Sequence, residues 1–162
     1  MDISTKMQDA INDQIQAEYY SSYLYLAMSA YCEEINMPGF AHWMRKQAEE
    51  EVEHAMKFYH YVVERGGRVV FGAIEQPPVD YDSILAVAEE TLAHEQKVTS
   101  LIYQLYEVAL EEKDYATQSL LKWYIDEQVE EEDNARTIVD QLKMVGGHTN
   151  GLIMLDKQLG AR

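Results

Sequence analysis

Apolar and polar residues follow a helical pattern over four long stretches of the chain. The stretches are separated by clustered helix breakers, which are Pro38-Gly39, Gly66-Gly67, Gly72, Pro77-Pro78 and Gly146-Gly147. Between these breakers the pattern predicts long helices over residues 5–34, 39–65, 83–111 and 114–144. A leucine repeat near the C-terminus favours a short fifth helix over 148–159.

Apolar residues recur three or four positions apart along each predicted helix, which is the spacing of a face buried in a helical bundle. The positions of this face, apolar except for Ser22, are Ile11, Ile15, Ser22 and Tyr25 in the first helix, Phe40, Met44, Phe58 and Tyr61 in the second, Ile84, Ala88, Val98, Ile102 and Ala109 in the third, and Leu121, Tyr124, Ala135, Ile138 and Leu142 in the fourth. The sequence therefore predicts an all-α four-helix bundle.

The lengths of the connections predict how the helices are arranged. Short turns join the first helix to the second and the third to the fourth, so each pair is expected to be antiparallel. The segment from Gly66 to Asp82 has no helical pattern. Its roughly 16 residues reach about 50 Å when extended, whereas the second helix is about 40 Å long. This segment is expected to cross the whole bundle and to make the second and third helices parallel.

The apolar stripe of each long helix is interrupted near its middle by side chains that can ligate a metal. The interrupting residues are Glu18 in the first helix, Glu51 and His54 in the second, Glu95 in the third, and Gln128 and Glu131 in the fourth. Positions halfway along the helices of a bundle lie at the same height. The six side chains are therefore expected to meet in one slice of the core.

Buried carboxylates without compensation destabilise a protein by several kcal/mol each. The four glutamates of this slice carry a charge of −4, which two divalent cations would neutralise. A donor set of carboxylates with one imidazole favours a redox metal, with iron first, and differs from the Cys and His ligands of structural zinc sites. The pattern predicts a site for two iron ions in each chain.

Composition narrows the class of protein further. The 162 residues fit a single domain over 1–162. A net charge of −16 argues against nucleic acids and anionic membranes as partners. The single cysteine, Cys32, excludes an intrachain disulfide and is expected to be buried. The first residues show no secretion signal, and we expect a cytoplasmic protein. The remaining histidines, which are His42, His60, His94 and His148, are interpreted as ordinary surface or core residues.

The motifs resemble those of the ferritin-like di-iron carboxylate proteins, a family in which glutamates and histidines of a four-helix bundle hold two metal ions. The segment 49–55 resembles the iron-oxidising segment on the second helix of these proteins, and 123–132 resembles the fourth-helix segment of bacterial non-haem ferritins. Haem-binding bacterioferritins carry a second Glu-x-x-His where this chain has Gln128 and Glu131, and a methionine where it has Val52. The resemblance therefore implies no haem.

The resemblance also implies a role for each residue. Glu18, Glu51 and His54 would hold the first iron, and Glu51 would bridge to a second iron held by Glu95. Glu131 would lie nearby, and Gln128 would be either a weaker donor or a hydrogen-bond partner of the ligands. Tyr25 would hydrogen-bond a ligand or donate an electron, or else only fill the core. A third iron site beside the pair would use side chains that could instead form a solvated acidic face; these are Glu50, Glu127, Glu130 and Glu131.

The resemblance implies an enzyme that oxidises Fe(II) with dioxygen or peroxide, and a hollow shell of twenty-four identical chains that stores the ferric mineral and removes free iron. Two other functions fit the same residues. A small di-iron oxidase or peroxidase would use the same ligands without storage. A metal-free helical interaction module would contain the polar slice for another reason.

Overall fold

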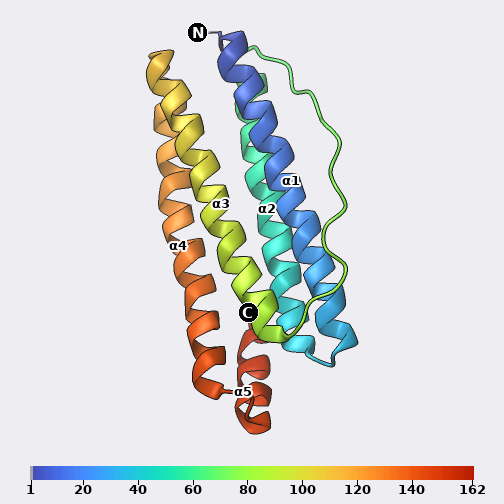
Figure 1. The fold of residues 1–162 in the computed structure, drawn as a ribbon. Helices are drawn as coiled ribbons and strands as arrows, with labels where there is room; N and C mark the ends of the chain where they lie inside the picture. The colour runs from blue at the N-terminus through green and yellow to red at the C-terminus, as the bar shows by residue number, and fades with distance from the viewer. Residues whose placement is uncertain (1) are drawn as a thin grey trace.

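The computed structural model describes residues 2–162 and forms five helices within that range. The helices are α1 (Thr5–Glu34), α2 (Pro38–Glu64), α3 (Ile84–Glu111), α4 (Tyr115–Val145) and α5 (Thr149–Leu159). Every boundary lies within one residue of the sequence-based prediction. The predicted all-α bundle with a short fifth helix is confirmed (Figure 1). None of the helices in the described part of the chain combines the length and the apolar composition that a membrane span requires.

Local sequence determines where the long helices begin and end. The hydroxyl of Ser4 accepts a hydrogen bond from the Met7 amide at 3.1 Å, and the Ser83 hydroxyl does the same for Ala86. Such side chains satisfy amides that have no partner inside the helix. Pro38 begins α2, where its missing N–H costs nothing. Gly146 ends α4 with a positive φ of 58°, a conformation that glycine adopts without strain.

The predicted topology is confirmed. Helix α1 runs antiparallel to α2, and α3 runs antiparallel to α4, while the extended segment 65–83 passes along the whole bundle beside α1 (Figure 1). Polar side chains of α1 hold this crossover. The Asn12 amide donates to the Arg68 carbonyl at 3.1 Å and accepts from the Val70 amide at 3.3 Å, and Gln16 donates to the Ala73 carbonyl. The crossover therefore leaves α2 and α3 parallel.

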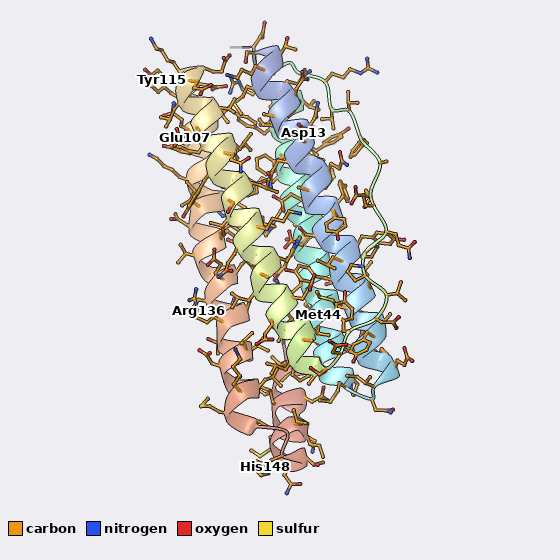
Figure 2. All side chains as sticks on the ribbon, in the orientation of Figure 1. Asp13, Met44, Glu107, Tyr115, Arg136 and His148 are labelled. Carbon is orange, nitrogen blue, oxygen red and sulfur yellow. The ribbon has the colours of Figure 1, made fainter. Side chains whose placement is uncertain are left out.

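Two apolar clusters fill the bundle, one on each side of its middle. One contains Tyr25, Met28, Phe40 and Met44 with residues of α5, and the other contains Met7, Phe58 and residues near the opposite end of α3. Met44 lies inside the bundle, while Glu107, Tyr115 and Arg136 lie on its surface (Figure 2). Cys32 is buried, as predicted, and burial raises the pKa of its thiol to about 12. Polar side chains occupy the level between the two clusters.

Candidate metal centre

The six side chains that interrupt the apolar stripes are all buried in the bundle. The most exposed of them, His54, has a relative exposure of only 6%. They come from all four long helices, and they are Glu18, Glu51, His54, Glu95, Gln128 and Glu131. Each predicted interruption is therefore an inward-facing polar residue rather than a solvated one.

Glu18, Glu51 and His54 bring three donor atoms close enough to share one cation. One donor atom of each side chain lies within 4.8 Å of the other two, and His54 Nδ1 is 3.4 Å from Glu51 Oε2. Glu18 Oε2 and Glu51 Oε2 are buried and accept no hydrogen bond. A buried oxygen without a partner is strongly unfavourable. These two oxygens fit a site whose remaining partner is a metal ion.

Glu95 is held from two sides. Tyr25 donates a hydrogen bond from its hydroxyl to Glu95 Oε1, and Gln128 donates from Nε2 to Glu95 Oε2 at 3.1 Å. Gln128 also lies within 3.3 Å of the Thr99 hydroxyl. These contacts orient the Glu95 carboxylate in the slice, and they place Tyr25 in direct contact with a candidate ligand.

The electrostatics of the slice reflect carboxylates crowded away from water. Burial raises the pKa of Glu18 and of Glu51 well above the usual range, and a neighbouring carboxylate (Glu51 for Glu18, and Glu95 for Glu51) raises each further. Burial likewise raises the pKa of Glu95, and it raises the pKa of Glu131 to about 7 with help from Glu95. Their ionised forms are therefore costly unless a cation is bound beside them.

The residues predicted for a third iron lie at the edge of this slice. Glu127 Oε1 is 4.0 Å from His54 Nε2, so it adjoins the buried group. Glu50 is partly exposed and forms an ion pair with Arg162 at 2.6 Å, and Glu130 is exposed. Of the four residues, only Glu131 is buried.

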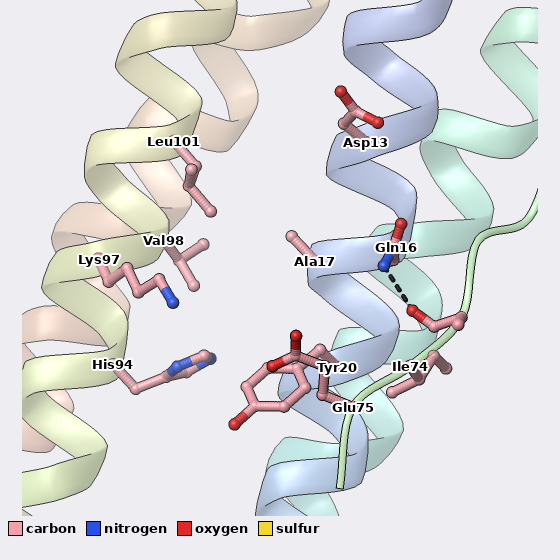
Figure 3. A pocket seen from close by; sticks show the side chains of 11 residues that line it. Asp13, Gln16, Ala17, Tyr20, Ile74, Glu75, His94, Lys97, Val98 and Leu101 are labelled. Atoms are coloured by element: carbon pink, nitrogen blue, oxygen red, sulfur yellow. Dashed lines mark hydrogen bonds between the residues drawn. The ribbon is translucent and has the colours of Figure 1, made fainter. Parts of the chain in front are cut away.

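His94 is the remaining histidine with a distinctive environment. It packs edge-on against Tyr25, with ring centres 5.8 Å apart, and its Nε2 lies 2.8 Å from the Ser21 hydroxyl. Burial lowers its pKa to about 4, so the ring is neutral at pH 7. It borders a pocket of about 660 Å³ between α1, α3 and the crossover, together with Tyr20 and Lys97 (Figure 3). None of the predicted ligands lines this pocket.

Comparison with known proteins decides the family. The family model described as the ferritin-like domain matches residues 8–145. The bacterial non-heme ferritin of Staphylococcus aureus (strain USA300) is 42% identical over 160 residues, which cover 99% of this chain and 96% of that protein. The chain belongs to the ferritin family. The resemblance seen in the sequence motifs is confirmed.

Solved ferritin structures agree with this assignment. An open-pore ferritin from the hyperthermophilic archaeon Archaeoglobus fulgidus matches with a TM-score of 0.98 and 50% sequence identity, over 99% of this chain and 98% of that one. A form of the A. fulgidus ferritin engineered to be closed matches with the same TM-score, identity and coverage. The ferritin bundle of this chain therefore extends over the four long helices and α5.

Two glutamines of this ferritin site were not among the predicted ligands. Gln14 donates to Glu18 Oε1 at 2.9 Å, and Gln47 donates to Glu131 Oε2 at 2.7 Å. Both are buried, and both lie four residues before a carboxylate on the same helix face, Gln14 before Glu18 and Gln47 before Glu51. That spacing is visible in the sequence. Gln14 binds one oxygen of Glu18 and leaves Oε2 without a hydrogen-bond partner, whereas Gln47 holds the Glu131 carboxylate.

Proposed function

We propose that this chain oxidises Fe(II) at a paired-metal centre and stores the ferric product inside a shell of identical chains. One observation carries the proposal: a member of the ferritin family buries four carboxylates and a histidine in one slice, and two of the carboxylate oxygens have no hydrogen-bond partner. Fe(II) is the substrate of this reaction and, once oxidised, the cargo of the shell.

The donor set divides between two ions. Glu18, Glu51 and His54 are assigned to the first iron, because their donor atoms already lie together. Glu51 then bridges to a second iron held by Glu95, with Glu131 beside it. Gln128 contributes by holding Glu95 in place. Two divalent ions neutralise the charge of the four carboxylates, which the low dielectric of the bundle otherwise makes unfavourable.

Oxidation needs little chemistry from the protein itself. Two Fe(II) ions supply the two electrons that reduce one dioxygen to the level of peroxide. The side chains hold the two ions side by side, and their negative charge stabilises the ferric products. Within the same proposal, a third iron binds at the edge of the slice to the buried Glu131 and the partly exposed Glu50 and Glu127, with the exposed Glu130 beside them.

Replacing Tyr25 by Phe tests how far the support of Glu95 matters. The variant loses the hydroxyl that donates to Glu95 Oε1 and keeps the ring that fills the core. We expect the initial rate of Fe(II) oxidation to fall about 10-fold, because hydrogen-bond partners of metal ligands commonly contribute 10- to 100-fold to affinity or activity. Stopped-flow absorbance of the ferric product measures the rate. An unchanged rate and an unchanged Fe(II) affinity would show that Tyr25 only fills the core.

Sedimentation of the purified protein tests the shell. A particle of about twenty-four times the 18.7 kDa chain mass supports assembly into a shell that could hold the mineral. A monomer or dimer that still oxidises Fe(II) would favour the small di-iron oxidase. If the purified protein neither binds metal nor oxidises Fe(II), the metal-free interaction module is favoured instead.

A further inference from the structure

An arginine that follows α5 reaches the edge of the metal slice. Arg162 Nη2 donates to Glu50 Oε2 at 2.6 Å, and Nη1 donates to Gln47 Oε1. The guanidinium also lies over the Trp43 ring, 5.1 Å from its centre. Its side chain is 30% exposed, so it is partly withdrawn from water. The Arg162 guanidinium therefore binds Glu50, a carboxylate that the proposed function assigns to the third iron.

The contact continues from Arg162 into the buried slice. Gln47 accepts from Arg162 through Oε1, which leaves its Nε2 to donate to Glu131 Oε2 at 2.7 Å. Arg162 thereby fixes the direction in which the Gln47 amide points. Glu131 is occupied by this amide, and Glu50 is occupied by the guanidinium itself. Two of the carboxylates expected to bind the third iron are therefore held by one connected group of hydrogen bonds.

The fold holds Arg162 at this place. Helix α5 turns back against the start of α2, and the chain end lies beside the bundle (Figure 1). Asp156 Oδ1 accepts a hydrogen bond from the Phe40 amide at 2.9 Å, and His42 Nε2 donates to the Arg162 carbonyl at 2.8 Å. The contact is so close that a Cβ atom on Gly39 would lie 1.7 Å from the Asp156 carbonyl oxygen. Only glycine allows this approach.

We propose that the Arg162 guanidinium is a built-in competitor for the third iron, and that a cation binds at Glu50 and Glu131 only by displacing it. The inference rests on the proposed function, because it needs the third site beside the pair. Arg162 is a regulating residue rather than a ligand. Its displacement frees Gln47 to turn and Glu131 to accept a metal, so the occupancy of the third site is coupled to the docking of α5.

Titration with Zn(II), which is not oxidised, tests the inference by isothermal calorimetry. In Arg162→Gln we expect the third Zn(II) to bind about 10-fold more tightly than in the natural chain, since a charge-assisted hydrogen bond of ordinary strength corresponds to about this factor. The two tighter sites are expected to keep their affinity. Arg162→Lys should give an intermediate value.

A matched control separates this competition from a general change of charge. Arg136 on α4 is half-exposed and pairs with Glu132 and Asp133, so Arg136→Gln removes the same charge away from Glu50. Its third-site affinity should equal that of the natural chain. Gly39→Ala should act like Arg162→Gln, because the added Cβ would clash with the Asp156 carbonyl oxygen and displace α5 while the Arg162 charge stays in the chain.

The possible outcomes distinguish a failure of this inference from a failure of the proposed function on which it rests. One outcome is two tight Zn(II) sites in every variant and a third site that is equally strong in Arg162→Gln and Arg136→Gln. This result would show that Arg162 does not compete for the third site, and it would still support the paired centre. Two tight sites and a gain confined to Arg162→Gln and Gly39→Ala would support it. The absence of tight Zn(II) sites in the natural chain would overturn the proposed function and this inference together.

Discussion

Glu51→Gln is expected to slow the initial oxidation of Fe(II) by about 100-fold or more, because loss of a ligand should exceed the 10- to 100-fold effects seen for the hydrogen-bond partners of ligands. Glu51 contributes the carboxylate between the two proposed irons, and one of its oxygens has no other partner. The amide keeps the size of the side chain and removes its charge. His54→Ala should give a similar loss by removing the imidazole. Stopped-flow absorbance after mixing with Fe(II) in air measures both rates.

The fold should survive these substitutions. Burial already raises the pKa of Glu51 well above its usual range, so the neutral amide removes an unfavourable charge from the core. Circular dichroism should show unchanged helicity. Glu53→Gln is the matched control, because Glu53 lies on the exposed face of the same helix and its rate should remain that of the natural chain. If both Glu51→Gln and His54→Ala oxidise Fe(II) at the rate of the natural chain, the metal centre does not lie in this slice.

The second large effect is expected in the protein stripped of metal by a chelator. Its free energy of unfolding should fall as the pH rises from about 4.5 towards 7 and above. A carboxyl whose pKa is raised in the folded state holds its proton more tightly there than in the unfolded chain. It stabilises the fold below its unfolded pKa, and this contribution is lost as the pH rises through the folded pKa.

Glu131 defines the pH range of this loss most clearly, because its pKa moves from the ordinary value of 4.5 to about 7 in the folded protein. A shift of this size corresponds to a free energy on the order of 3 kcal/mol. The pKa values of Glu18 and Glu51 are raised well above the usual range and act in the same direction. Divalent ions should reverse the loss, since they bind the ionised carboxylates. Zn(II) should therefore raise the Tm more at pH 7.5 than at pH 5.

Calorimetric Tm values measured across this pH range, with and without Zn(II), check the prediction. Glu131→Gln should flatten the decline between pH 4.5 and 7, because it removes the group that titrates there. Glu130→Gln should not, because Glu130 is exposed. A chelated protein whose Tm stayed constant or rose from pH 5 to 7 would show that these carboxylates are not crowded in the folded state.

The periodicity of the sequence is sufficient to predict the bundle and the centre of the site. A polar residue in the middle of an apolar stripe has to face the core, so the stripe pattern alone places Glu18, Glu51 and Glu95 in one slice. The length of 65–83 determines the topology for a similar reason, because the chain has to cover the length of the bundle. Breakers such as Pro38 and Gly146 locate the helix ends.

Other features depend on contacts that no local pattern reveals. The side chain of Arg162 lies more than a hundred residues from Gln47 and Glu50 in sequence, and its position depends on how α5 docks against Gly39. Glu127 and Glu130 belong to a charge-rich run in which periodicity alone does not distinguish a partly buried carboxylate from a solvated one. Their places are determined by the packing of α4 beside α2, which is a tertiary effect.

The central claim is that iron oxidised at the paired centre is stored by the same protein. The most direct measurement is to add excess Fe(II) in air, desalt the protein, and count the iron retained per chain while recording the rate of oxidation. We predict fast oxidation and retained iron far above two ions per chain. Fast oxidation with about two ions retained would contradict storage, and oxidation no faster than in protein-free buffer would contradict the metal centre itself.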